Sequence, residues 1–385
     1  MALPLSFTVI LLALAYAGLM VVYAQGWRGL PEWRLPPGFV AATRVTVIIP
    51  ARNEAANIGA CLNAILNGDY PLELLEIVVV DDHSDDATPE IVKALQSRFA
   101  QLRLVALADF INEADQTKAY KKQAIDQGIG QASGEIMVTT DADCLAGPQW
   151  ISLIVAVFQA QPEVKIITAP VLFHREMTLF QRFQALDFLG LMGITGAGIY
   201  YRFQHMGNGA NLAFRKTLFA ELGGYAGNDH QASGDDMFLI QKVAARYPRG
   251  VFFLKNTAAT VFTEAMPDLR SFLQQRLRWG TKNAALPEWP IRLALAAVFL
   301  FCWSIVINLL ALPFIPMAWP LALFQILIKA TADFLFLALL CRYFDCRELL
   351  RVFWPSFFLH TLYIALVGAA SLVFKKFDWK GRRVR

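Results

Sequence analysis

The sequence has few cysteines, and none of them pair at the spacing of a disulfide framework or a zinc site. The five are odd in number and scattered: Cys61, Cys144, Cys302, Cys341 and Cys346. This pattern argues against both kinds of site and is typical of a reducing compartment. The five histidines also lack metal-ligand spacing, so we assign none of them to a metal.

Charged residues are scarce as well, at 17% of the chain, whereas 56% of the residues are hydrophobic. The mean hydropathy of +0.43 is too high for an ordinary soluble protein. The net charge of +4 is modest, and no nucleic-acid-binding signature is present, so we expect no nucleic-acid partner. The basic residues flank apolar segments, which favours contact with an anionic membrane surface.

Residues 1–27 contain no charge, and the apolar run at 3–24 is long enough to span a bilayer. A cleaved signal peptide is the alternative, but the run has no Lys or Arg before it, which favours an uncleaved transmembrane anchor. The first basic residues follow in the linker, residues 28–43. The positive-inside rule then predicts an integral membrane protein, of the bacterial inner-membrane kind, with its catalytic domain in the cytosol.

A second apolar region covers residues 290–375, with candidate spans at 291–312, 319–340 and 354–374. The loop around Arg347 and the tail, residues 376–385, are both basic. Three full crossings from a cytosolic domain would place that tail outside. We therefore expect two or three spanning helices, with 354–374 either re-entrant or interfacial, and the topology stays open.

Between these regions, β-rich runs alternate with helical patterns. The runs at 44–50, 74–80, 103–106 and 135–140 are followed or separated by helical segments such as 87–99 and 120–131. This alternation predicts an α/β fold with a mainly parallel sheet. Polar residues follow the strands, so we expect them to gather along one edge of the sheet.

Asp141 and Asp143 follow the run at 135–140. In extended chain, residues two apart point to one side, so both carboxylates would face the same space. Mg²⁺ prefers such oxygen ligands and shares them with phosphates. Taken alone, the pair is more typical of a solvated turn, and the pattern favours a small buried residue over a ligand for the adjacent Cys144.

Two further segments carry candidate functional groups. Asp235 and Asp236 begin a helical pattern, where acidic residues also serve a purely structural role and Ser233 could cap the helix. The segment at 269–279, within 266–289, is amphipathic and basic, with Arg276 and Arg278 on its polar side. Such helices often lie in the membrane interface.

Four motifs now stand in order: Asp-Asp-His-Ser at 81–84, Asp-Ala-Asp at 141–143, Gly-Asp-Asp at 234–236 and Gln-Arg-Leu-Arg-Trp at 275–279. Over residues 44–285 the chain resembles the inverting family 2 glycosyltransferases of the QxxRW type. These include ceramide glucosyltransferases and polysaccharide synthases. The resemblance implies a GT-A fold over 44–265, with a mixed, mainly parallel sheet and helices on both faces, plus transmembrane helices.

The resemblance also implies roles for single residues. Asp143, with Asp141, would hold a Mg²⁺ or Mn²⁺ ion that stabilises a departing diphosphate. The implied nucleotide contacts are Glu54, Asp81, Asp82 and Lys121, with Lys122 as an alternative to Lys121. For both lysines, a solvated helix face remains the plain structural alternative.

Asp236 aligns with the second acid of the family's acidic pair, which implies a general base, and Asp235 would orient it or bind substrate. Gln275, Arg278 and Trp279 would close the site, although Trp279 also suits an interfacial anchor. The loop at 207–211 (Gly-Asn-Gly-Ala-Asn) is expected near the donor sugar.

The predicted function is therefore inverting transfer of a sugar, from a nucleotide-sugar donor, to a membrane lipid or lipid-linked acceptor. UDP is expected by resemblance, and GDP and dTDP stay open. One alternative is a processive polysaccharide synthase, and another is an inactive nucleotide-sugar-binding membrane scaffold.

Overall fold

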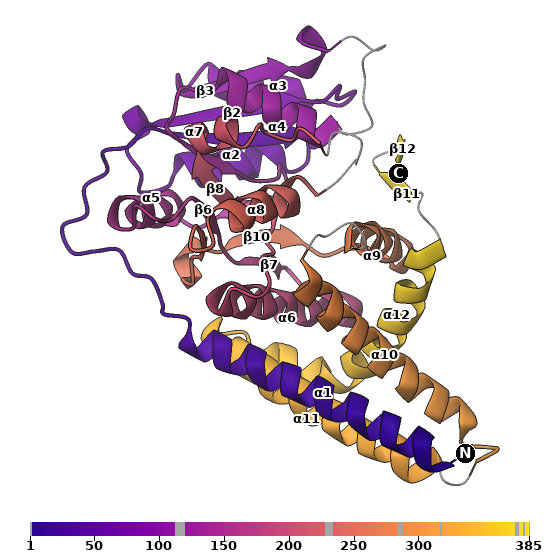
Figure 1. Ribbon diagram of the computed structural model, residues 1–385. Coiled ribbons are helices and arrows are strands. Elements are labelled where there is room, and N and C mark those ends of the chain that lie inside the picture. The colour runs from indigo at the N-terminus through magenta and orange to yellow at the C-terminus, as the bar shows by residue number, and fades with distance from the viewer. Residues whose placement is uncertain are drawn as a thin grey trace. The chain divides into compact units, whose positions relative to one another are not determined.

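The computed structural model describes residues 2–111, 120–227, 234–283, 288–315, 318–373, 377–379 and 382–384. The chain groups into two compact units. The sheet unit contains residues 31–174, 205–264 and 378–385, and the helical unit contains residues 1–30, 175–204 and 265–377. In Figure 1 the elements of both units are coloured by residue number, from indigo at the N-terminus to yellow at the C-terminus.

The sheet unit is built on a seven-stranded sheet in the order β3-β2-β1-β4-β8-β6-β9. The strands are β1 (Val45–Ala51), β2 (Leu75–Asp81), β3 (Leu102–Ala106), β4 (Ile136–Thr139), β6 (Ile166–Thr168), β8 (Leu212–Arg215) and β9 (Val251–Phe253). β8 runs antiparallel to both neighbours, and the remaining pairs are parallel. The predicted mixed, mainly parallel sheet is confirmed.

The described part of this unit also contains a smaller sheet and six α-helices. The small sheet has the order β5-β10-β7, formed by β5 (Leu145–Ala146), β10 (Val261–Glu264) and β7 (Val171–His174). The helices are α2 (Ile58–Leu66), α3 (Thr88–Gln96), α4 (Tyr120–Gln131), α5 (Trp150–Ala160), α7 (Lys216–Glu221) and α8 (Asp235–Arg246). The chain ends in a β11–β12 pair, Phe377–Trp379 with Arg382–Val384.

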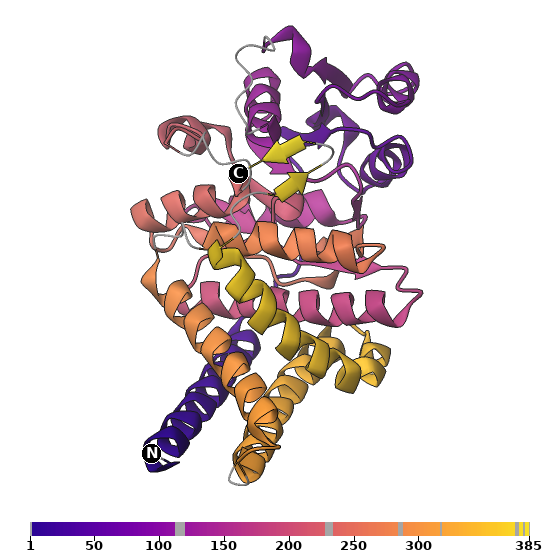
Figure 2. The same cartoon turned by 90° about the vertical axis from the view of Figure 1, so that its right-hand side faces the viewer.

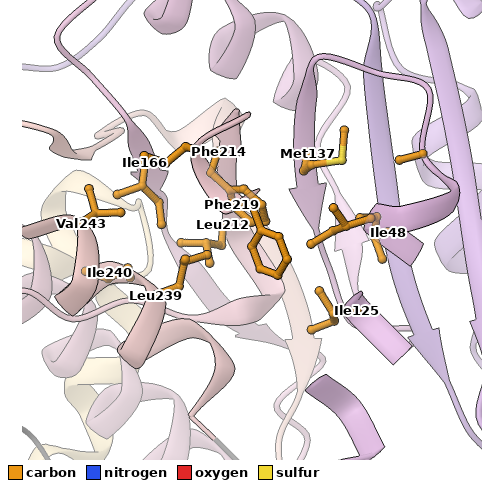
Figure 3. Packing of buried hydrophobic residues seen from close by; sticks show 13 residues of the cluster. Ile48, Ile125, Met137, Ile166, Leu212, Phe214, Phe219, Leu239, Ile240 and Val243 are labelled. Carbon is orange, nitrogen blue, oxygen red and sulfur yellow. The ribbon is translucent and has the colours of Figure 1, made fainter. Parts of the chain in front are cut away.

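The core of the sheet unit explains why its strands read as continuous apolar runs. Val47, Ile48 and Ile49 of β1 are all 0% exposed. Because successive residues of a strand point to opposite faces, both faces of the sheet must be covered. Figure 3 shows one of them, where Ile48 and Met137 of the sheet lie with Ile125 of α4 in one buried cluster.

The same cluster reaches α8 through Leu239, Ile240 and Val243, and it includes Phe214 of β8 (Figure 3). Each fully buried aliphatic or aromatic side chain of this kind contributes about 1.5–3 kcal/mol to folding. The packing fixes α4 and α8 on the sheet, and these two helices carry candidate functional residues at their N-terminal ends.

The helical unit contains α1 (Ala2–Gly29), α6 (Leu179–Tyr201), α9 (Leu269–Asn283), α10 (Trp289–Ala311), α11 (Ala318–Tyr343) and α12 (Phe353–Val373). Helix α1 packs against α6, α10 and α11 (Figure 2). Within the described residues, four segments are apolar enough, by length and composition, to cross a membrane: 6–29, 289–311, 318–343 and 347–371. They include the apolar runs predicted at both ends of the chain and indicate membrane association.

Helix α6 has no counterpart among the predicted elements. It begins with a capping box between Thr178 and Gln181, in which each residue bonds the other's backbone. Its residues are apolar around most of the helix, so no clear 3.6-residue stripe separates it from a buried strand or a loop. Asp187 is its single acidic residue.

Two glycines of α4 give a direct test of the packing of this helix on the sheet. A Cβ added at Gly128 would lie 2.6 Å from Ile48 Cγ2, whereas a Cβ at Gly130 meets nothing within 4 Å. We expect Gly128→Ala to lower the unfolding free energy by a net of about 1–2 kcal/mol. Gly130→Ala, as the matched control, should raise it by up to about 1 kcal/mol. Thermal unfolding of both purified variants in one detergent measures the difference, and equal midpoints would contradict this packing.

Candidate active site

Three parallel strands end at one edge of the sheet unit. Ala51 of β1 lies beside Asp81, the last residue of β2. On the other side of β1, Ile48 lies beside Thr139, the last residue of β4. The parallel register therefore brings the start of the 141–143 segment to the edge at which Asp81 and Asp82 lie.

The loops that follow β1 and β2 are joined by reciprocal hydrogen bonds. The backbone N–H of Asn53 donates to Ser84 Oγ at 3.0 Å, and the N–H of Asp85 donates to Asn53 Oδ1 at 3.0 Å. Glu54 N donates to Thr88 Oγ1 at 2.8 Å. Asn53 adopts a left-handed conformation with φ of 54°, which Asn tolerates better than most residues. These bonds hold Glu54 next to the second strand's loop.

Asp81 and Asp82 differ in what their carboxylates contact. Asp82 Oδ1 lies 3.0 Å from His83 Nδ1, and Arg52 donates to the carbonyl oxygens of both residues, at 2.8 and 3.2 Å. Asp81 Oδ2 accepts from Ser84 N at 3.3 Å. Asp81 Oδ1 is buried and has no hydrogen-bond partner among the described residues. Such an oxygen is suited to accept a hydrogen bond from a ligand.

The Asp-x-Asp segment provides the donor set of a cation site. One ligand atom from each of Asp141, Asp143 and Cys144 lies within 4.8 Å of the others. Both carboxylates are half-buried, so neighbouring groups restrain them while a ligand can still reach them from solvent. Thr263 Oγ1 of β10 donates to Asp143 Oδ2 at 3.4 Å and orients it. Two carboxylates fit the hard, oxygen-preferring cations Mg²⁺ and Mn²⁺.

The two cysteines near this segment behave as buried packing residues. Cys61 and Cys144 are 0% and 2% exposed. Burial, and then the neighbouring Asp143 and Asp141, raise the pKa of both thiols above the usual range. This shift favours the thiol form, and Cys144 Sγ donates a hydrogen bond to Asp143 Oδ1 at 3.5 Å.

Lys121 connects the Asp-x-Asp segment with the acidic pair of α8. Its ammonium lies 2.6 Å from Asp141 Oδ1 and 3.9 Å from Asp235 Oδ2. Burial by itself would lower the pKa of Lys121, but Asp141, Asp235 and Asp236 outweigh it and raise the pKa above its usual range. The ammonium therefore stays charged wherever the carboxylates are ionised.

The alternative that Lys121 and Lys122 lie on a solvated helix face is wrong. Lys122 is 2% exposed, and its ammonium lies over the ring of Phe238, 5.3 Å from the centroid. Successive residues of a helix point about 100° apart, so the two lysines take different directions. Lys121 is the one whose ammonium lies 2.6 Å from Asp141.

Helix α8 presents its acidic pair at its first turn, after Gly234, whose φ of 91° suits glycine. Asp236 accepts two backbone hydrogen bonds, from Gly209 N at 3.0 Å and Met237 N at 2.7 Å. Asp235 is buried, whereas Asp236 is half-buried. Asp236 is thus fixed in orientation and still reachable from solvent. Ser233, the expected cap, lies outside the described residues.

The predicted loop at 207–211 contacts this pair. Thr139 Oγ1 donates to Gly209 O at 2.6 Å, which ties the loop to β4. A Cβ at Gly209 would lie 3.0 Å from Asp235 Oδ2, so this position favours glycine. Asn211 Nδ2 donates to the carbonyls of Pro170 and Ala259 at 2.8 and 2.9 Å, and Asn211 Oδ1 accepts from Trp150 Nε1. The loop is built as a rigid support.

Gln275, Arg278 and Trp279 all lie on α9, in the helical unit. The ring of Trp279 packs 5.8 Å from that of Phe188. Gln275 Oε1 is buried without a hydrogen-bond partner among the described residues. Arg276, expected on the polar side of an interfacial helix, is instead 6% exposed and paired with Asp187 at 2.7 Å. That expectation was wrong because amphipathic spacing cannot reveal an ion pair with a distant helix.

Sequence comparisons place the chain in a known family. Residues 46–223 match the model of Glycosyl transferase family 2, and residues 136–373 match that of Glycosyl transferase family group 2. The probable glycosyltransferase YdaM of Bacillus subtilis (strain 168) is 25% identical over 258 residues, 66% of this chain and 58% of that protein.

Two shorter matches are with other glycosyl-transferring enzymes. The glycosyltransferase AglE of Haloferax volcanii is 38% identical over 107 residues, 28% of this chain and 33% of that protein. The beta-monoglucosyldiacylglycerol synthase of Trichormus variabilis is 27% identical over 117 residues, 30% of this chain and 24% of that protein. The chain thus spans less than two thirds of the length of each of these three relatives.

Among solved structures, the mannosyltransferase PcManGT from Pyrobaculum calidifontis, in complex with GDP-Man and Mn²⁺, is similar in fold. It aligns with a TM-score of 0.61 at 25% identity, over 96% of this chain and 99% of that one. With one family model matching well over half of its residues, the chain belongs to glycosyltransferase family 2, the enzymes that transfer a sugar from a nucleotide-sugar donor.

Proposed function

We propose that this enzyme transfers one sugar, with inversion, from a nucleotide sugar to a lipid or lipid-linked acceptor at a membrane. The observation that carries the proposal is the arrangement of the sheet unit's edge. Lys121 joins Asp141 to Asp235, Asp143 lies beside Asp141, and Asp236 is held by Gly209. This arrangement is suited to hold a cation and a donor diphosphate next to an oriented carboxylate.

Asp141 and Asp143 would hold a divalent cation, Mg²⁺ or Mn²⁺. When bound, this ion supplies Lewis-acid stabilisation of the departing diphosphate. Glu54, Asp81 and Asp82 would line the nucleotide pocket. Of these, Asp81 has the buried carboxylate oxygen suited to a base or ribose donor group, while Asp82 contacts His83 and the loop.

Asp236 would act as the general base that removes the acceptor hydroxyl proton as the sugar is attacked opposite its leaving group. Its two backbone hydrogen bonds fix the carboxylate and leave lone pairs for the acceptor. Asp235 would set the position of Lys121 and the electrostatics of the pair. On α9, Gln275, Arg278 and Trp279 would contact substrate, in keeping with the QxxRW resemblance.

The similar proteins reduce the number of candidate donor nucleotides and acceptors, but they do not identify either one. The resemblance favours UDP, whereas the similar mannosyltransferase was solved with GDP-Man, so both donors belong in the first screen. The match to beta-monoglucosyldiacylglycerol synthases supports a lipid acceptor. Arg28 and Arg34 after the first apolar helix favour a cytosolic sheet unit.

A donor screen tests the function. Purified protein with labelled UDP-, GDP- and dTDP-sugars, Mn²⁺ and lipid extract should yield a single glycolipid by mass spectrometry. Asp236→Asn should lower kcat by about 10²–10⁴-fold, because the base is lost while the side-chain shape is kept. Glu221→Gln, at an exposed carboxylate paired with Arg246, is the matched control and should keep the wild-type rate. Release of free sugar only, or a polymer, would refute single transfer to lipid.

The cation site has its own test, in which the readout is binding. Asp143→Asn should weaken Mn²⁺ binding at least about tenfold, measured by electron paramagnetic resonance of the free ion. Cys144→Ser should change the affinity by less than about threefold, because Mn²⁺ and Mg²⁺ prefer oxygen ligands and a serine hydroxyl can also donate to Asp143. An equal loss of Mn²⁺ affinity in both variants would contradict this expectation and would show that Cys144 is also a ligand of the ion.

Lys121→Gln leaves the carboxylates of Asp141, Asp235 and Asp236 without the lysine's charge. In metal-free buffer we expect it to lower the unfolding free energy by about 1–3 kcal/mol, and Mn²⁺ should restore part of this by binding Asp141. A lysine pKa that is raised in the fold favours the charged form at every pH below it, so the stability difference should stay constant from about pH 6 to 9. Lys93→Gln, at an exposed lysine of α3, is the control. A difference that disappears within this pH range would contradict the pairing.

A further inference from the structure

The helical unit contains a chain of charged side chains that the proposed reaction does not use. Asp187 of α6 is paired with Arg276 of α9 at 2.7 Å, and the two side chains are 9% and 5% exposed. Tyr363 of α12 donates to Asp187 Oδ1 at 2.8 Å. A buried carboxylate and guanidinium are costly unless each is paired, so both must stay in this geometry.

The chain of contacts continues into the apolar helices. His360 Nε2 of α12 lies 3.6 Å from Asp187 Oδ1, and its Nδ1 lies 3.3 Å from the ammonium of Lys329 on α11. Lys329 is 0% exposed and pairs with Asp333 Oδ2 at 2.6 Å. An ammonium only donates, so Nδ1 accepts and the ring proton sits on Nε2, facing Asp187. A neutral His360 thus contacts one member of each ion pair: the carboxylate of Asp187 through Nε2 and the ammonium of Lys329 through Nδ1.

Helix α6 holds α9 at a second point, one turn away. Gln184, which is 0% exposed, donates through Nε2 to Met266 O at 2.9 Å and accepts from Met266 N at 3.0 Å. Residues three apart lie on one face of a helix, so Gln184 and Asp187 present their side chains together. Met266 stands three residues before α9 begins. The lead-in and the middle of α9 are therefore both tied to α6.

The anchored face of α9 differs from the face that carries its other polar groups. Arg276 lies over the rings of Trp279 and Phe272, 4.3 and 4.8 Å from their centroids. Arg278 is about 200° around the helix from Arg276 and so points away from the anchor. The buried Arg276–Asp187 pair, together with the Gln184 contacts, thereby sets the rotation of the helix that presents Arg278.

We propose that Asp187 is a positioning residue for glycosyl transfer. Through its ion pair with Arg276 it fixes the rotation and axial position of α9, and hence the side chains of Gln275, Arg278 and Trp279. This rests on the function proposed for those three residues. Displacing reacting groups by about 1 Å can cost about 100-fold in rate. The neighbouring Lys329–Asp333 pair and His360 hold Asp187 in turn.

Asp187→Asn keeps the side-chain shape and removes the charge that holds Arg276. We expect kcat to fall about 10–100-fold, with the Mn²⁺ affinity unchanged because Asp141 and Asp143 lie in the sheet unit. Gln325→Met is the matched control. It breaks a buried hydrogen bond from Asn308 in the same helical unit, at 2.6 Å, without touching α9, and its kcat should stay within about threefold of wild type. An equal loss in the control would make the effect one of general helix packing and overturn the proposal.

A double-mutant cycle separates positioning from mere destabilisation. If Asp187 acts through α9, Asp187→Asn should cost less than about threefold in an Arg278→Ala background, because the group it positions is gone. Additive losses, or no loss from Asp187→Asn alone, would overturn the inference. If Asp187→Asn does not fold, Asp187→Glu and Arg276→Lys, which keep the charges but shift the geometry, enter the same cycle with the same criteria. If Arg278→Ala itself has the wild-type kcat, the failure lies in the proposed role of α9.

Discussion

The ammonium of Lys121 holds together carboxylates that would otherwise repel one another. Asp141 comes from the segment after β4, and Asp235 and Asp236 come from the first turn of α8, almost a hundred residues later. Without a cation between them, close carboxylates of this kind would favour protonation or separation. The packing of α4 on β1 sets where Lys121 stands, so the hydrophobic core beneath it and the charge arrangement above depend on each other.

The helical unit also contains charged side chains that must be neutralised, and there they are neutralised in buried pairs. Arg276, Asp187, Lys329 and Asp333 are neutralised in pairs, with His360 between the pairs. Ionisable groups among apolar helices are expensive unless paired, and they commonly mark functional positions. In the sheet unit the pairing leaves carboxylate oxygens reachable for a ligand. In the helical unit the paired groups are largely buried, which suits a role in holding helices in fixed positions.

Much of the fold followed from patterns along the chain. The runs at 44–50 and 74–80 are strands because fully buried strands read as continuous apolar stretches, and the segment predicted as a helix at 120–131 is α4 with the same bounds. The strands β5 to β10 and the helices α5, α6 and α7 were not predicted. Strands of two to four residues and the six-residue α7 carry too little periodicity, while α5 and α6 are apolar on nearly every side.

The sequence by itself determined the order of the motifs, the α/β class of the central region and the apolar helices at both ends, because these follow from local composition and spacing. Only the tertiary structure decided that Lys121 meets Asp141 and Asp235, that Asp81 keeps a buried oxygen without a partner among the described residues, and that Arg276 is buried against Asp187. These outcomes depend on contacts between residues far apart in the chain, and a pattern of neighbours contains no information about which distant charge lies opposite.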